Sequence, residues 1–255
     1  MEDVDEPRCS QAHADAILRV LEACGFEWDG EVVYQSRRKE HYQAALERLA
    51  DAGHAYPCAC SRREIADSSM SGIEGPVYPG TCRGGLKGRA PRAWRVRVNR
   101  EPVCFEDRLQ GEYCQNLEAD IGDFVIRRAD NLFAYQLAVV ADDQEQGITH
   151  VVRGADLLAS TPRQIRLQRL LGYVEPAYLH LPVAVNEAGQ KLSKQTQAAP
   201  LEAHKPGPAL VAALRFLGQK PEDALAHAKG AEILVQAIER WSLPAELCKA
   251  RHCTV

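Results

Sequence analysis

The sequence lacks the features of a secreted or membrane-embedded protein. No apolar stretch approaches the roughly 20 residues that a membrane-spanning helix requires. The first residues, MEDVDEPR, are acidic and do not follow the basic-then-apolar order of a signal peptide. No internal repeat or low-complexity segment is visible. These absences exclude secretion and membrane insertion, and they predict a cytoplasmic protein.

Global positive charge is also absent. The chain has 35 acidic and 31 basic residues and a net charge of −4, which excludes a protein that binds nucleic acid over its whole surface. Positive charge is local instead, because the range 83–100 holds seven basic residues and no acidic one. Such a patch can meet phosphates, since neutralising them releases counterions. A solvated basic face is an equal alternative.

A disulfide framework is the third expected absence. Nine cysteines are an odd number, and a protein without an export signal stays in a reducing compartment. Cys58 and Cys60 are one residue apart, and Cys82 follows a Gly- and Pro-rich stretch, which favours metal ligation over three buried free thiols. The six remaining cysteines show no ligand spacing, and we expect them to be buried as small apolar residues: Cys9, Cys24, Cys104, Cys114, Cys248 and Cys253.

What is present indicates an α/β fold. With 255 residues, of which 45% are hydrophobic, the chain can form one sizeable domain with an appended subdomain. Capping residues and apolar spacing predict helices over 10–25, 36–53, 161–172, 209–217 and 231–241, with Thr161 as the cap of the third. Alternating or continuous apolar residues predict strands over 94–98, 124–126, 133–140, 151–152 and 178–185, and a hairpin over 103–114. Strands that alternate with helices are typical of α/β proteins.

Two segments carry residues suited to chemistry. Lys191 and Lys194 flank Ser193 on a polar loop after the strand 178–185, where they can surround a polyphosphate; a merely soluble loop is the alternative. Arg153 lies at a strand end before Gly154, the edge at which parallel sheets collect ligands, and its guanidinium suits a carboxylate. A surface salt bridge is the other interpretation of Arg153.

Other polar residues have weaker patterns. Tyr135 lies in the predicted strand 133–140, from which its hydroxyl can reach the crevice beside Arg153, although a core aromatic is the simpler interpretation. Asp142 and Asp143 are interpreted as strand-end or helix-cap residues. The eight histidines show no metal-like spacing, and we expect His150 and His180 to be structural.

Several motifs, in matching order, resemble one family. The segment Lys191-Leu-Ser-Lys-Gln195 resembles the KMSKS loop of class I aminoacyl-tRNA synthetases. THVVRGADLLAST (149–161), LHLPV (179–183) and the opening MEDVDEPR resemble the glutamyl/glutaminyl branch of that class. YPCACSRREI (56–65), followed by YPGTC (78–82), is similar to the zinc-binding insert of this branch. The resemblance covers nearly the whole chain.

The resemblance implies a fold and an activity. The fold is a class I synthetase Rossmann-like nucleotide-binding fold with a zinc-binding insert and a small C-terminal helical part. Its first strand and its HIGH-like motif have no counterpart in this sequence. The implied division is 1–55 for the first catalytic half, 56–120 for the insert, 121–200 for the second catalytic half and 201–255 for the helical part. The nearest group within the branch uses ATP to attach glutamate to the queuosine base of tRNA(Asp). A truncated ordinary glutamyl-tRNA synthetase and a catalytically impaired tRNA-binding remnant are the alternatives.

The resemblance also implies site residues and partners. It assigns L-glutamate to Glu2, Tyr135 and Arg153, with Glu2 taking the ammonium group. ATP, which enters with Mg²⁺, is assigned to Lys191, Leu192, Ser193, Lys194 and Gln195. One structural Zn²⁺ is assigned to Cys58, Cys60, Tyr78 and Cys82. The implied partners are L-glutamate, ATP and tRNA(Asp), and we expect a monomer.

Overall fold

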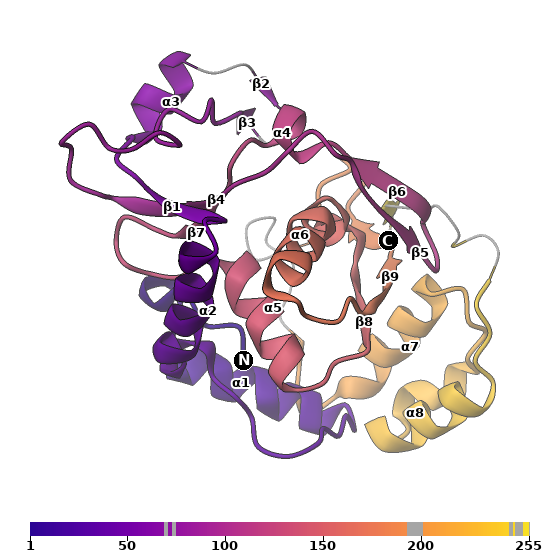
Figure 1. Cartoon of the computed structure of the whole chain (residues 1–255). Coiled ribbons are helices and arrows are strands. Elements are labelled where there is room, and N and C mark those ends of the chain that lie inside the picture. Colours follow the sequence, from indigo (N-terminus) through magenta and orange to yellow (C-terminus); the bar gives the residue numbers. More distant parts are fainter. Residues whose placement is uncertain (69–70, 73–74, 193–200, 245–246, 248–251, 255) are drawn as a thin grey trace.

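The computed structural model describes residues 1–68, 71–72, 75–192, 201–244, 247 and 252–254 (Figure 1). The α-helices of these residues are α1 (Gln11–Ala23), α2 (Lys39–Asp51), α3 (Arg62–Ser68), α4 (Leu117–Asp120), α5 (Tyr135–Glu145), α6 (Thr161–Leu171), α7 (Pro206–Phe216) and α8 (Gly230–Glu239). Their strands are β1 (Ala55–Cys58), β2 (Ser71–Gly72), β3 (Gly75–Pro76), β4 (Ala93–Val96), β5 (Val103–Asp107), β6 (Gly111–Gln115), β7 (Val125–Arg127), β8 (His150–Gly154), β9 (Ala177–Leu181), β10 (Val183–Val185) and β11 (His252–Thr254).

Two larger sheets organise the molecule. The first has the order β6-β5-β9-β8, in which β9 runs parallel to both β5 and β8, while β5 and β6 form an antiparallel hairpin. The second is antiparallel, with the order β1-β4-β7. Because β8 and β9 are parallel, their carboxyl ends meet at one edge of the first sheet, where Arg153 pairs in register with His180.

The hydrophobic core lies where α2, α5 and α6 pack against one another and against the strands (Figure 1). Leu49, Leu137 and Ile165, one from each helix, are completely buried. Complete burial of such a side chain contributes roughly 1.5–3 kcal/mol of hydrophobic stabilisation. This core therefore holds α5 and α6 rigidly beside the edge of the first sheet.

Most predicted elements are confirmed, but the predicted strand 133–140 is wrong. Residues 135–145 form α5, and Leu137 to Asp142 are buried on every side of it. A helix that is enclosed all round loses the alternation of apolar and polar faces by which a helix is identified from sequence. The apolar residues 133–140 therefore have the pattern of a buried strand, although most of them form a helix.

The start of α6 also differs in detail. Ser160 is its N-cap residue, and Thr161, the predicted cap, is the first residue inside the helix. The Ser160 side chain makes no capping bond, and the Thr161 hydroxyl accepts a hydrogen bond from Arg153 and donates one to the Leu157 carbonyl over 3.3 Å. Gly172 ends the helix in the left-handed conformation, as predicted.

The predictions for the cysteines outside the cluster are partly wrong. Cys104 and Cys114 form a disulfide across the β5–β6 hairpin, where they are direct partners with Cα atoms 4.1 Å apart. Cys9 is exposed, whereas Cys24 is buried as expected. Cys248 and the Cys253 side chain lie outside the described residues.

The first and last helices meet backbone to backbone. Gly25, at φ +84°, follows α1, and a Cβ atom added to it would lie 2.4 Å from the Ala231 nitrogen at the start of α8. A Cβ atom added to Gly230 would lie 2.4 Å from the Cys24 carbonyl carbon. Since real Cβ atoms do not approach so closely, this crossing requires glycine at both positions.

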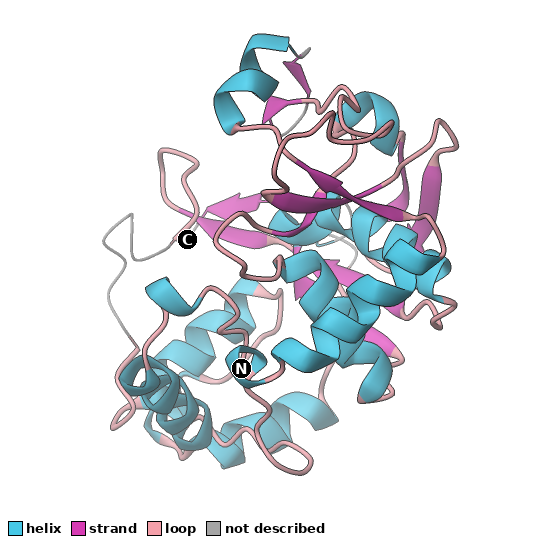
Figure 2. Cartoon of the chain, turned by 60° about the vertical axis from the view of Figure 1, so that its left-hand side comes forward, coloured by secondary structure: helices cyan, strands magenta, loops and turns pink. Residues whose placement is uncertain are grey.

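The helical pair α7 and α8 lies at the opposite end of the molecule from α3 (Figure 1), and Figure 2, turned by 60° about the vertical axis, shows α3 again at the top. Among the described residues, the structure has no helix with the length and apolar character needed to cross a membrane.

Candidate active site and metal site

Arg153 lies near the carboxyl end of β8, as the sequence predicts. Its Nε donates to His180 Nε2 over 3.0 Å, and its Nη2 donates to Gln164 Oε1 over 2.6 Å and to Thr161 Oγ1 over 2.9 Å. The guanidinium also lies 5.6 Å from the centre of the Tyr178 ring. Arg153 is thus a fixed, half-buried cation rather than half of a surface salt bridge.

Tyr135, the first residue of α5, is the second predicted glutamate contact. Burial raises the pKa of its phenol to about 12; the negative charge of Glu2 adds to this rise, and the positive charge of Arg153 opposes it. Asp143 also contributes negative charge that raises the pKa of Tyr135. The three residues predicted from the sequence therefore interact, although Tyr135 is presented by a helix rather than by the predicted strand.

The segment that carries Glu2 is pinned by its neighbours. The Met1 carbonyl accepts a hydrogen bond from the Gln35 backbone N–H over 3.2 Å. Asp3 accepts two from Ser36, over 3.0 Å from its backbone N–H and over 2.7 Å from its hydroxyl. Glu2 therefore has a fixed backbone between two anchored residues.

Asp143 belongs to the same group, which sequence reasoning missed. Burial raises its pKa to about 6; Arg153 opposes this rise, while Asp142 and Glu2 reinforce it. The prediction of a strand-end or cap residue is wrong, because Asp143 lies within α5, eight positions after Tyr135. Its electrostatic coupling to Arg153 and Glu2 places a second carboxyl beside the candidate ligand site.

Asp142 has a structural role inside α5 instead. It is buried and accepts hydrogen bonds from Gln35 and Tyr42, and it forms an ion pair with Arg38 over 2.9 Å. His41, Asp142 and Glu145 have the spacing of a metal site, but Arg38 also forms an ion pair with Glu145. This group is therefore an ion-pair network that ties α2 to α5.

The loop after β10 contains the predicted ATP residues. Lys191 forms an ion pair with Asp156, and its backbone bridges to Val185. Leu192 is exposed, and its N–H bonds to the Ala184 carbonyl. Ser193, Lys194 and Gln195 lie outside the described residues. The loop thus starts beside residues 155–160, which follow directly after β8.

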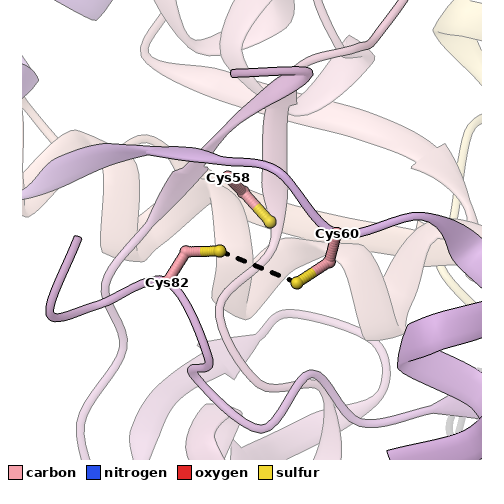
Figure 3. A group of neighbouring side chains, drawn as sticks. All are labelled: Cys58, Cys60 and Cys82. Carbon is pink, nitrogen blue, oxygen red and sulfur yellow. Dashed lines mark hydrogen bonds between the residues drawn. The ribbon is translucent and has the colours of Figure 1, made fainter. Parts of the chain in front are cut away.

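The three predicted thiol ligands converge. Figure 3 shows the Sγ atoms of Cys58, Cys60 and Cys82 pointing toward one another, and all three lie within 4.8 Å of each other. The Cys60 and Cys82 sulfurs are 3.6 Å apart, and a tetrahedral Zn²⁺ with Zn–S bonds of about 2.3 Å requires about 3.8 Å. The spacing of the thiols therefore suits a tetrahedral metal ion.

Tyr78, the predicted fourth ligand, lies beside the three thiols. Its hydroxyl oxygen lies 3.4 Å from the Cys58 sulfur and 3.9 Å from the Cys60 sulfur, and it accepts the Cys82 N–H over 2.9 Å. A bound metal ion would displace the protons of the three thiols and of the phenol. Three thiols and a phenol, all facing one point, are a donor set compatible with zinc.

Three of the seven basic residues in the run 83–100 form ion pairs with acids from other segments. Arg83 pairs with Asp123 and Glu118, Arg89 with Glu64, and Arg100 also with Glu118. Arg95 is buried with its guanidinium 3.9 Å from the Tyr78 ring centre. Much of the run is therefore structural, and Arg92 is one of its exposed members.

Comparison with known proteins follows the motifs. The family model of the class I (E and Q) tRNA synthetases, catalytic domain, matches residues 1–251. A glutamyl-Q tRNA(Asp) synthetase of Dechloromonas aromatica is 61% identical over 248 residues, which cover 96% of this chain and 82% of that protein. Proteins of the same name from Aromatoleum aromaticum and Geobacter sulfurreducens are 55% and 54% identical; each match covers 95% of this chain, and 77% and 78% of those proteins.

Solved structures share the fold. The chain superposes on a glutamate-tRNA synthetase from Elizabethkingia anophelis with a TM-score of 0.74 at 21% identity, and on a glutamate tRNA ligase from Elizabethkingia meningosepticum with 0.73 at 21%. All of this chain is covered, and it spans 60% and 59% of those longer chains. By its family match and by its identity to these curated relatives, the chain belongs to the class I tRNA synthetases of the E and Q type, within the glutamyl-Q tRNA(Asp) synthetase group.

Proposed function

We propose that the chain activates L-glutamate with ATP and transfers the activated carboxyl to the queuosine base of tRNA(Asp). The observation that carries this proposal is the fixed guanidinium of Arg153 at the carboxyl edge of the parallel pair β8 and β9, with Tyr135 and Glu2 within electrostatic range. The names of relatives that are more than 50% identical support the same substrates. A cation, a hydroxyl and a carboxylate in one group match the carboxylate and the ammonium of an amino acid.

The chemistry needs positioning and charge stabilisation rather than a strong base. Arg153 would bind a carboxylate of glutamate, with Tyr135 beside it and Glu2 on the ammonium group. The α-carboxylate would attack the α-phosphorus of ATP, and the bond to the β-phosphate oxygen would break, so that pyrophosphate leaves. Mg²⁺, when bound with ATP, would neutralise phosphate charge. Lys191 and Lys194 would neutralise the growing phosphate charge. A nucleoside hydroxyl of the tRNA then attacks the acyl carbon and AMP departs.

Two assays test this function. We expect the purified chain to catalyse glutamate-dependent exchange between ATP and pyrophosphate without tRNA, and to glutamylate queuosine-containing tRNA(Asp) but not tRNA(Glu). Transfer to tRNA(Glu) would instead identify an ordinary glutamyl-tRNA synthetase. Absence of both exchange and transfer, with tRNA binding retained, would identify a catalytically impaired remnant.

Replacing Lys194 by Ala should reduce the exchange rate by about 10²–10³-fold, the usual effect of removing one donor to a developing negative charge. Circular dichroism should show an unchanged fold. Lys220→Ala, on the connection between α7 and α8, is the matched control and should exchange at the normal rate. An unaltered rate in Lys194→Ala would reject the role of this lysine.

We propose that Cys58, Cys60, Tyr78 and Cys82 hold one structural Zn²⁺. The convergence of their donor atoms supports this, as does the joint burial of Tyr56, Cys58, Ala59, Tyr78 and Cys82 in a small cluster separate from the main core. When bound, the metal would cross-link the end of β1 to the loop 78–82. It would orient this region of the chain and take no part in the reaction.

The double variant Cys58→Ser, Cys60→Ser should contain no zinc, whereas elemental analysis of the unmodified chain should give about one zinc per chain. Because a structural zinc site contributes directly to folding, we expect limited proteolysis within residues 56–92 to become faster in the variant. Cys9→Ser, which changes an exposed thiol, should keep its zinc. A metal-free chain that is folded and fully active would remove the zinc assignment.

We propose that tRNA contacts a groove of about 640 Å³ beside the thiol cluster. Its lining includes Arg62, Arg63, Arg92, Arg95 and Arg128, with Asp130 as its acid. Arg62, Arg63 and Arg92 are exposed. A cationic groove on an otherwise acidic protein is suited to a phosphate backbone.

Arg92→Ala should weaken tRNA binding for all tRNA sequences and reduce the slope of log K against log salt by about 1, as expected when one phosphate contact is lost. Filter binding between low and moderate salt measures this slope. Arg19→Ala, which removes an exposed arginine from α1, should leave it unchanged. Equal slopes for the Arg92 variant and the unmodified chain would place the tRNA elsewhere.

We also propose the division into the ranges 1–55, 56–120, 121–200 and 201–255, a monomer, and a cytoplasmic location. The thiol cluster, a small buried group separate from the main core, supports treating the region around it as a unit within 56–120. Substrates such as ATP and tRNA are consistent with the cytoplasm.

A further inference from the structure

The guanidinium of Arg153 is held from two sides by protein atoms. His180 Nε2 faces its Nε at 3.0 Å, while Gln164 and Thr161 take its Nη2. Gln164 is itself fixed, because its Nε2 donates to Gln136 Oε1 over 2.9 Å. Within the part of the chain that the structure describes, Arg153 makes no hydrogen bond through Nη1. That nitrogen is therefore the one left for a ligand.

His180 is in turn fixed by Asp107. The imidazole is completely buried, and its Nδ1 lies 2.6 Å from Asp107 Oδ2. Asp107 Oδ1 accepts the backbone N–H groups of Leu109 and Gln110. Burial alone would raise the pKa of the Asp107 carboxyl, but these bonds and the bond from His180 outweigh it, so its pKa is lowered and it is ionised at neutral pH.

Two of the three polar groups that face the His180 ring require the same tautomer. The third, the Thr161 hydroxyl at 3.2 Å from Nε2, can donate or accept and so requires neither. An ionised carboxylate only accepts, so Nδ1 carries the proton, and a guanidinium only donates, so Nε2 must be bare. The aromatic rings of Phe105 and Tyr178 lie beside the imidazole, with ring centres 6.3 and 6.1 Å away, and limit its rotation. The carboxylate, the imidazole and the guanidinium thus form one hydrogen-bonded chain from β5 through β9 to β8.

We propose that Asp107 and His180 are positioning residues that set the orientation of Arg153 toward the carboxylate of glutamate. This inference rests on the proposed function, because it gives Arg153 the substrate carboxylate. A buried polar network is retained at little stability benefit over apolar packing, so its value here is the geometry that it imposes on the one residue it shares with the ligand site. Neither residue touches the substrate.

Two substitutions of similar size separate this role from simple core packing. In His180→Gln the amide reaches the position of Nε2 and can still accept from Arg153. In His180→Asn the amide reaches the position of Nδ1, so Asp107 keeps its partner, whereas Arg153 loses the acceptor of its Nε and keeps the two acceptors of its Nη2. We expect His180→Asn to raise the KM for glutamate about tenfold with a smaller change in kcat and an unchanged KM for ATP. His180→Gln should stay within about threefold of the unmodified chain.

Calorimetry of glutamate binding distinguishes the possible failures. If the unmodified chain binds no glutamate, the proposed function fails and this inference fails with it. If the unmodified chain binds glutamate and His180→Asn binds it equally well, or if Asn and Gln have the same effect, only the positioning role is overturned.

The tautomer of His180 can be measured directly in the unmodified chain. We expect ¹⁵N NMR to show His180 protonated at Nδ1 and bare at Nε2, with a scalar coupling from Nε2 to Arg153 Nε across the N–H···N hydrogen bond. Arg153→Lys identifies the arginine signal by its loss. A histidine protonated at Nε2 would contradict the proposal.

Discussion

Replacing Arg153 by Lys is expected to lower kcat/KM for glutamate in the exchange reaction about 100-fold. Lysine keeps the positive charge but has one nitrogen, which cannot bond to His180, Gln164 and Thr161 and also present a donor to the substrate. Four fixed donor positions become one mobile ammonium group. The loss should therefore be largest in the step that depends on a precisely oriented carboxylate.

The matched control is Arg169→Lys on the same helix as Gln164. Arg169 forms a surface ion pair with Glu175 over 2.7 Å, and such pairs contribute little. The control should keep its kcat/KM, and both variants should keep their far-ultraviolet spectra. If Arg153→Lys loses less than about threefold, the carboxylate is bound elsewhere.

Replacing Asp123 by Asn is expected to lower the free energy of unfolding at pH 7 by about 3–5 kcal/mol. Asp123 is completely buried. Its carboxylate accepts hydrogen bonds from Nε and Nη2 of Arg83 over 2.6 Å each, and it also accepts hydrogen bonds from the Tyr56 hydroxyl and the Val98 N–H. Removing its charge leaves the partly buried Arg83 without its main partner. Urea unfolding measures the difference.

The Asp123 carboxylate also predicts how the stability of the fold changes with pH. Burial would raise the pKa of Asp123, but Arg83, Tyr56 and Val98 outweigh burial and lower it. A lowered folded-state pKa contributes stability that is complete above the unfolded value of about 3.9 and is lost as the pH falls through the folded value. The gap between the unmodified chain and Asp123→Asn should thus be full at pH 7 and shrink below about pH 4.

Asp130→Asn is the control for this series. Asp130 is an exposed aspartate paired with Arg128 over 2.6 Å, so its replacement should cost less than about 1 kcal/mol. Equal losses from Asp123→Asn and Asp130→Asn, or a gap that grows in acid, would contradict the assignment of Asp123 as the anchor of this region.

Local signals explain which parts of the fold could be predicted from sequence. Ser10 caps α1 by accepting the His13 N–H, and Gly172 ends α6 with a left-handed backbone. The start of α1 and the end of α6 are therefore each determined by a single residue that can be recognised in the sequence. The hairpin of β5 and β6 follows from apolar alternation and Gly111. A hairpin centred on residue 109 places 104 opposite 114, so the sequence held the geometric signal for the disulfide. We nevertheless expected free thiols, because disulfides are rare in a reducing compartment.

Tertiary context explains the failures. The strand predicted over 133–140 is α5, since only the surrounding elements determine that a short apolar run is enclosed as a helix. The basic run 83–100 looked unopposed because Asp123 and Glu118, which pair with Arg83, lie outside it. Charge counted along the chain does not report charge in space.

Some residues of the candidate site could be predicted from the sequence, and others could not. Arg153 could be found because it lies at the end of an apolar strand, and the thiols could be found because Cys58 and Cys60 are neighbours in sequence. Asp107 and His180 could not be linked, because 73 positions separate them and no local pattern marks either. The assignments of Glu2 and Tyr135 came from family resemblance, and their roles remain predictions.

The glycine crossing between α1 and α8 places the backbones of two distant parts of the sequence in direct contact. Peptide groups in direct contact leave no side chain that could rotate to absorb a shift, so sliding one helix must drag the other. A displacement of α8 would therefore reach α1 and, through the connecting residues 4–10, the segment that carries Glu2 and Asp3.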